Sequence, residues 1–231
     1  MKPPNMHSVQ LELMHPVQIY KRILSCDKRA ESKVRLEMGL RETKRRERHE
    51  KIMETGLRLF TERGYAATTL DAIADESGIA RRTFFHYFRS KEEIILAWQG
   101  MVPDELRNEI RRLGAATSPF KTVETALSLL ARKMKPETAI MIGRIVKSEE
   151  QLIAGNQAKF IEMERAAFEA LSALWPDEAR AVGLRYVALT AVGAMRLSFD
   201  AWVGEECEKP LDLYLAERFA ALRDELHLNR G

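Results

Sequence analysis

The spacing of apolar residues is typical of α-helices throughout the well-patterned part of the chain. Ile52, Leu59 and Phe60 recur at helical intervals, and the stripe stops at Gly64, a residue suited to the left-handed turn that ends a helix. Strand-like alternation of apolar and polar residues does not compete with this pattern. The sequence therefore predicts an all-α fold whose first helix begins near Thr43.

Short helices are predicted directly after this one. Thr68 or Thr69 can cap a helix that ends at a Ser-Gly pair, because a threonine hydroxyl accepts from the free N–H groups of a first turn. A further helix is expected over residues 81–88. Ser90 followed by Glu93 has the form of a capping box, which opens the next helix.

Longer helices, about six of them, are predicted beyond Gly100. Proline is tolerated in the first turn of a helix, and it marks helix starts at Ser118-Pro119, Lys135-Pro136, Trp175-Pro176 and Lys209-Pro210. The segment 179–203 is apolar on almost every side, so we expect it to be central or to lie at an interface.

The composition is ordinary for a soluble helical protein, with 45% hydrophobic and 31% charged residues among 231. No apolar run approaches the roughly 20 residues needed to span a bilayer, and the first residues lack the continuous apolar stretch of a secretory signal. Cys26 and Cys207 form no Cys/His cluster, so neither zinc nor a disulfide framework is indicated. We therefore expect a cytoplasmic protein with no membrane partner and two reduced thiols.

Charge is divided unevenly along the chain. Residues 1–91 hold 19 Lys and Arg against 12 Asp and Glu, whereas residues 92–231 hold 18 against 22. The basic half is the half expected to meet nucleic acid. Its most basic stretch is interrupted by Glu42 and Glu47, so a solvated helix start and an arm for the minor groove are equally open. That stretch comprises Arg41, Lys44, Arg45, Arg46 and Arg48.

Residues 69–88 supply the parts of a helix-turn-helix. This motif needs two helices packed across each other, a tight turn that usually contains glycine, and exposed polar and basic side chains on the second helix. Gly78 lies in the predicted turn, and Ala74 is small where the helices must approach. The predicted shared core is Ile73, Ala74, Ile79, Phe84 and Phe88, and the side chains left to face outward are Arg81, Arg82, Thr83, Phe85, His86 and Tyr87.

The stretch LRLFTERGYAATTLDAIADESGIARRTFFHYFRSKEEII resembles the DNA-binding domain of the TetR family of transcription regulators. The resemblance is strong over roughly residues 45–100, and beyond them it extends only to helix count and order. The positions that carry it are Leu59-Phe60, Gly64, Thr68-Thr69, Ile73-Ala74, Gly78-Ile79, Thr83-Phe84-Phe85, Tyr87-Phe88 and Ser90-Lys91-Glu92. It implies a DNA-binding head, a ligand-binding body and repression relieved by ligand.

The resemblance also implies roles for single residues. It puts Arg81, Thr83 and Phe85 near base edges and Thr69, Tyr87 and Lys91 near phosphates, whereas Arg82 could do either. The chemistry agrees, since arginine pairs bidentately with guanine and the threonine methyl can meet thymine. One departure from the family pattern concerns Ala80, which offers no capping oxygen where many members have Ser or Thr, so we expect DNA to order this helix.

His86 is predicted to pack or to contact a phosphate rather than a metal, because no second ligand lies at suitable spacing. No metal and no cofactor are predicted.

An unknown small-molecule effector is expected in the long helices, and an apolar one suits their methionine and aromatic side chains. At helical spacing each of these side chains could equally belong to the core. The candidates are Met134, Met141, Phe160, Met163, Phe168, Trp175, Met195, Phe199 and Trp202.

These patterns predict three parts. Residues 1–38 are expected to be a flexible extension, and Met38 stands where a translation start would. Residues 39–100 form the DNA-binding domain, and residues 101–231 form the effector-binding and dimerisation domain. A homodimer is expected through the last two helices, around 177–203 and 210–226, so that two recognition helices meet a palindromic double-stranded operator.

The predicted function is that of a transcription regulator, a repressor released from its operator by a small apolar ligand. Two alternatives stay open: an architectural DNA-binding protein without an effector, and a helical enzyme. No GxSxG, HExxH, GxxxxGK or GxGxxG motif favours an enzyme, and the SxxK match at Ser118 stands without its companion motifs.

Overall fold

The computed structural model describes residues 41–225, apart from the side chain of Ser148. The predicted extension over residues 1–38, together with Met38 and Cys26, lies outside the described residues. The described residues divide into two units, residues 41–51 and residues 52–225. In the first unit the described residues, 41–51, are helical.

The second unit opens with a group of short helices. Residues 52–63 are helical and are followed by α3 (Leu70–Ser77) and α4 (Arg81–Phe84). Gly64 and Gly78 have positive φ angles of 87° and 67°, as their predicted places at helix ends require. The Thr69 hydroxyl caps α3 by accepting from the N–H of Ala72 at 3.1 Å.

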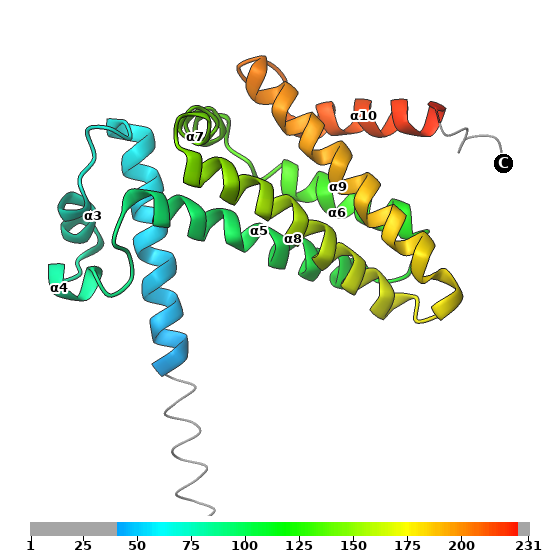
Figure 1. The fold of residues 1–231 in the computed structure, drawn as a ribbon, viewed down its shortest axis with the longest axis horizontal. Helices are drawn as coiled ribbons and strands as arrows, with labels where there is room; N and C mark the ends of the chain where they lie inside the picture. The colour runs from blue at the N-terminus through cyan, green and yellow to red at the C-terminus, as the bar shows by residue number, and fades with distance from the viewer. Residues whose placement is uncertain (1–40, 226–231) are drawn as a thin grey trace, which may run out of the picture. The chain divides into compact units, whose positions relative to one another are not determined.

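Six longer helices follow, and the all-α prediction is confirmed (Figure 1). They are α5 (Lys91–Leu113), α6 (Pro119–Ala131), α7 (Pro136–Ser148), α8 (Glu150–Leu174), α9 (Ala181–Gly204) and α10 (Leu211–Glu225), with the 3-10 turn η1 (Glu178–Arg180) before α9. Three predicted helix starts hold, because Ser90 caps α5, Pro119 opens α6 and Pro136 opens α7. Pro176 lies before η1 instead of opening a helix.

Helix α5 is the central helix of the second unit. It packs along α8 and also against α6, while α9 packs on α8 and α6 (Figure 1). Where α5 and α8 approach each other, a Cβ on Gly155 would collide with the end of the Leu96 side chain, which would have to move. The helix runs without a break through residue 100, the predicted domain boundary, and it contains Pro103 in its interior.

Two clusters of buried side chains stabilise this unit. One joins the short helices to α5 through Ile73, Phe84 and Ile94, and it extends to Ile142 and Val146 of α7. The other lies among α5, α6, α8, α9 and α10. Head and body therefore share packed side chains along α5 and α7, and the predicted boundaries at residues 38 and 100 stay predictions.

The last helix, one of the two expected to form the homodimer, has an apolar face that is buried within the chain. Leu211, Leu215 and Phe219 on this face are 2%, 0% and 0% exposed. These side chains pack against α6 and α9, because α10 lies across both helices. Leu226 lies outside the described residues.

Candidate nucleic-acid interface and cavity

Helices α3 and α4 pack across each other over a buried core. Ile73, Ala74, Phe84 and Phe88 are all at most 2% exposed, and the Phe84 and Phe88 ring centroids are 6.4 Å apart. Ile79, predicted for the same core, is partly buried and packs against it. The turn between the helices closes through hydrogen bonds from the Gly78 and Ile79 N–H groups to the end of α3.

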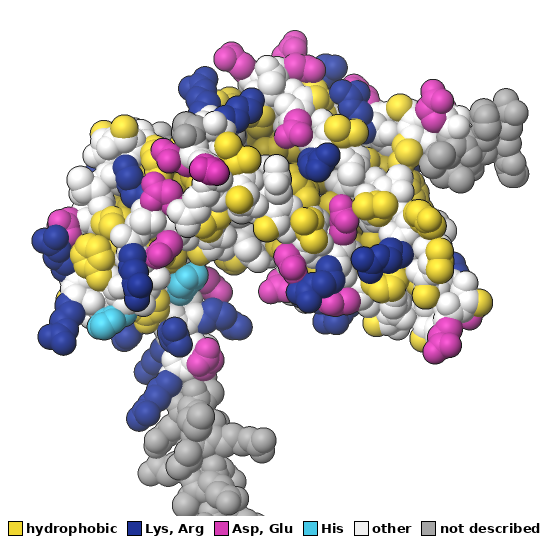
Figure 2. Space-filling view, viewed as in Figure 1, with side chains coloured by type: hydrophobic (Ala, Val, Ile, Leu, Met, Phe, Trp, Pro, Cys, Tyr) yellow, Lys and Arg dark blue, Asp and Glu magenta, His cyan; other side chains and the backbone are white. Residues whose placement is uncertain are grey.

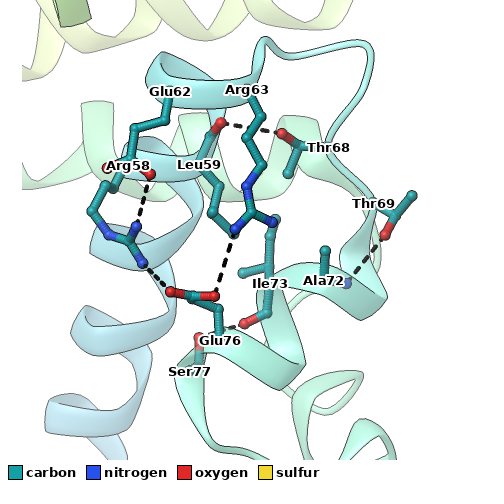
Figure 3. Close-up of polar contacts among 10 residues, drawn as sticks. All are labelled: Arg58, Leu59, Glu62, Arg63, Thr68, Thr69, Ala72, Ile73, Glu76 and Ser77. Atoms are coloured by element: carbon teal, nitrogen blue, oxygen red, sulfur yellow. Dashed lines mark hydrogen bonds and ion pairs between the residues drawn. The ribbon is translucent and has the colours of Figure 1, made fainter.

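Polar contacts fasten α3 to the helix over residues 52–63 (Figure 3). The Glu76 carboxylate accepts from Arg58 at 3.0 Å and lies 3.7 Å from the guanidinium of Arg63. On the other side of α3, the buried Thr68 hydroxyl donates to the carbonyls of Leu59 and Gly64. Sequence reasoning did not identify the Glu76 pairs, because residues 13 to 18 positions apart show no shared periodicity.

The second helix of the motif is shorter than predicted. Regular α-helix ends at Phe84, and a turn replaces the expected helix over residues 85–87, held by a hydrogen bond of 2.8 Å from the Tyr87 N–H to the Phe84 carbonyl. Ala80 makes no side-chain capping bond, as its chemistry predicts. The aromatic residues that follow have low helix propensity, so neither end of this segment favours extension.

The predicted base-reading residues lie at the surface, where Arg81, Arg82 and Phe85 are exposed and Thr83 is partly buried. His86, predicted to pack or to contact a phosphate, is exposed beside them. Figure 2 shows Lys, Arg and His side chains gathered on the surface over α4. Arg81 forms an ion pair with Asp71 at 2.9 Å and lies 5.7 Å from the centre of the Phe85 ring.

The predicted phosphate contacts are engaged within the chain to different degrees. The Thr69 hydroxyl accepts as a cap and keeps its own O–H to donate. Tyr87 is partly buried. The Lys91 ammonium donates to the Tyr65 carbonyl at 2.6 Å and lies 4.2 Å from the Tyr65 ring centre, so a phosphate would compete with this contact. The phenol of Tyr65 in turn donates to Glu92.

Burial is the main cause that raises the pKa of Tyr65 above its ordinary value, and the Glu92 carboxylate raises it further. The phenol therefore stays protonated and can donate at any physiological pH. This contact holds the loop before α3 against the first turn of α5.

A cavity of about 690 Å³, partly open to solvent, lies among α5, α7, α8 and α9. Of the nine predicted effector-contacting residues, five line it: Met134, Phe160, Met163, Met195 and Phe199. Met141 packs instead against the core of the short helices. Phe168, Trp175 and Trp202 belong to the core of the body, where the Trp202 indole donates to the Lys209 carbonyl at 2.7 Å.

Polar side chains in the cavity were not predicted. Asn156 and Lys159 of α8 line it together with Gln99 of α5. The available signal was helical spacing, because Leu152, Asn156, Lys159 and Met163 fall on one face of α8 whose other members are apolar. Among residues 41–225, no three His, Cys, Asp or Glu side chains come together in a group able to hold a metal ion.

None of the described helices is long and apolar enough to cross a membrane.

The packed first helix, the glycine turn and the exposed basic second helix define a helix-turn-helix DNA-binding protein. The family model of bacterial regulatory proteins, TetR family, matches residues 52–98. Residues 52–98 are therefore similar to the DNA-binding domain of this family.

Curated relatives agree with this assignment. The HTH-type transcriptional regulator YerO of Bacillus subtilis is 39% identical over 66 residues, which are 27% of this chain and 23% of that protein. The HTH-type transcriptional repressor KstR2 of Mycobacterium tuberculosis is 42% identical over 89 residues, covering 33% of this chain and 44% of the relative. The matches thus span less than half the length of these relatives, which are regulators by name and not enzymes.

Solved structures show that the fold is shared beyond the matched domain. The TetR family transcriptional repressor FadR of Thermus thermophilus, in complex with lauroyl-CoA, has a TM-score of 0.55 at 22% identity, over 75% of this chain and 92% of that one. The regulator FadR of Bacillus subtilis, in complex with stearoyl-CoA, has a TM-score of 0.53 at 17% identity, over 75% and 96%.

Proposed function

We propose that the chain is a cytoplasmic transcription repressor that leaves its operator when a small, largely apolar molecule occupies the cavity. The observation that carries the proposal is the continuity of α5. Its first turn meets the DNA-binding head at Ser90 and Lys91, and its middle supplies Trp98, Gln99 and Val102 to the cavity wall. A molecule that moves this wall must act on the element that positions the recognition helix.

A second path supports the same coupling. Ile142 and Val146 of α7 line the cavity and also belong to the buried cluster of the short helices. Packed side chains of this kind transmit displacement, because interiors are dense and resist compression. By linkage, a ligand that favours a head geometry unsuited to the operator weakens DNA binding by the factor by which DNA weakens ligand binding.

The homodimer is proposed to form through α9 rather than through α10. Val182, Tyr186, Leu189 and Leu197 form an exposed apolar stripe on α9, at 69%, 64%, 49% and 59% exposure. Gly193 completes the stripe, and a Cβ there would meet no atom within 4 Å, so another helix can approach closely. Figure 2 shows hydrophobic side chains on the surface over this helix. Exposed apolar stripes of this kind are typical of association surfaces.

The test is selection of DNA from a random pool by the purified full chain, followed by release assays with apolar compounds on the selected sequence. A palindromic consensus with a large preference over scrambled DNA is expected. Binding without sequence preference would instead favour the architectural protein. Absence of binding to any DNA would contradict the proposal and reopen the enzyme alternative.

A further inference from the structure

The cavity contains a cationic side chain with no anionic partner at pairing distance. The Lys159 ammonium donates to the Asn156 side-chain oxygen at 2.8 Å and lies 4.3 Å and 5.4 Å from the ring centres of Phe160 and Phe199. Within residues 41–225, no carboxylate forms an ion pair with it. Burial lowers the pKa of Lys159 to about 8, and the charge of Asp200 opposes this shift only in part.

The charges around the cavity favour an anion. Lys147 of α7, Lys159 of α8 and Arg196 of α9 line it, against a single carboxylate, Asp200 of α9. Lys147, Arg196 and Asp200 are exposed, whereas Lys159 is partly buried among aromatic rings. Solvent screens the exposed charges, so an anion beside Lys159 would interact mainly with this ammonium, whose partial burial among aromatic rings weakens the screening.

A second polar atom in the wall is unsatisfied. Gln99 is only 2% exposed, and its side-chain oxygen has no hydrogen-bond donor among the described residues. Buried acceptors are normally paired, so an unpaired one that lines a cavity indicates a polar group on an occupant. The rest of the wall is mainly apolar and includes Trp98, Val102 and Val203.

We propose that the cavity binds an amphipathic anion, an apolar molecule with one carboxylate or similar acidic group that pairs with Lys159. This inference rests on the proposed function in that it concerns the same cavity, and it narrows the effector from any apolar compound to one with an acidic head. The cavity volume lies within the range of small-molecule sites, about 300–1,000 Å³.

The experiment compares three probes with the same tail, decanoate, decanol and decylammonium, by titration calorimetry on the full chain at pH 7. Decanoate is expected to bind about tenfold or more tightly than decanol, because hydrogen bonds to charged groups are roughly twice as strong as neutral ones. Decylammonium is expected to bind most weakly. Equal affinities, a preference for decanol or decylammonium, or no binding of any probe would overturn the proposal.

Variants then assign the preference to Lys159. In Lys159→Met the decanoate affinity should fall to that of decanol, while decanol binding is retained and shows that the cavity is intact. Lys159→Arg should keep the preference for decanoate. The matched control is Lys121→Met, which removes an exposed lysine of α6 that does not line the cavity. It should leave the preference for decanoate over decanol unchanged. A decanoate preference that survives in Lys159→Met would refute the assignment.

Two further readouts separate this inference from the proposed function. The preference for decanoate should decline between pH 7 and pH 10, as Lys159 loses its proton. Operator release is measured with the same probes. Decanoate binding without operator release would refute the effector role and leave the anion site standing. Operator release by decanol but not by decanoate would refute the anion site and leave the effector role standing.

Discussion

Replacing Arg81 by alanine separates reading of bases from attachment to phosphates. In the free protein Arg81 pairs with Asp71, and the side chains are 71% and 49% exposed. Exposed ion pairs contribute about 0.2–1 kcal/mol, so breaking this one should lower the free energy of unfolding by less than about 1 kcal/mol. A bidentate arginine–guanine contact contributes about 1–3 kcal/mol of discrimination, which exceeds the cost of releasing Asp71.

Arg81→Ala should therefore weaken binding to the selected operator by about 5- to 150-fold per half-site and relax the preference at one base pair. Binding to scrambled DNA should change much less. The measurement is fluorescence anisotropy on operator and scrambled duplexes across a salt series. The control is Arg58→Ala, because Arg58 also makes exposed ion pairs but lies outside α4, and the ratio of operator to scrambled affinity should be unchanged.

Equal losses on both duplexes would refute the reasoning, since Arg81 would then be a phosphate anchor. Sequence reading would pass to its neighbours on the same surface, Arg82 and Phe85. Unfolding in urea checks that the variant keeps its stability within the expected limit.

Three further predictions concern the same domain. Gly78→Ala should lower the free energy of unfolding in urea by about 1 kcal/mol, because the φ angle of Gly78 is 67°, although an added Cβ would meet no atom within 4 Å. The control Gly100→Ala, in the middle of α5 and equally unobstructed, should leave the stability unchanged or raise it. Equal effects of the two substitutions would contradict this prediction. Ala80→Ser should stabilise by about 0.5–2 kcal/mol through the missing cap, and an unchanged midpoint would show that the cap does not form. Lys91→Ala should weaken operator and scrambled DNA alike and reduce the salt slope by about one, whereas an unchanged slope with lowered stability would assign Lys91 to its contact with Tyr65.

Local signals predicted the DNA-binding head well. Thr69, Gly78 and Ser90 each report a backbone requirement that holds in almost any context, a cap or a left-handed turn, so the helix ends could be found without the tertiary structure. The length of α4 could not be found in this way. Its residues satisfy a helical pattern, but their aromatic rings pack into a shared core that a tight turn serves equally well.

The body was predictable as helices but not as surfaces. The stripes on α9 and α10 look alike in sequence, and only packing shows that Leu215 is buried by α6 and α9 while Leu189 stays exposed. Lys159 was overlooked because a single lysine on a helix usually lies in solvent, and its enclosure depends on rings from α8 and α9. Such features depend on contacts between segments far apart in sequence.

Pro103 makes α5 easier to bend at one position. A proline inside a helix cannot donate to the carbonyl four residues earlier, which here belongs to Gln99, so the rod weakens beside the cavity wall. A helix weakened at one position bends there, while the segments on either side of it move as rigid bodies. We expect the bend at Pro103 largely to determine how far the DNA-binding helices rotate when the cavity wall is displaced. Substitutions in the wall could then change which molecule binds without changing the size of that rotation.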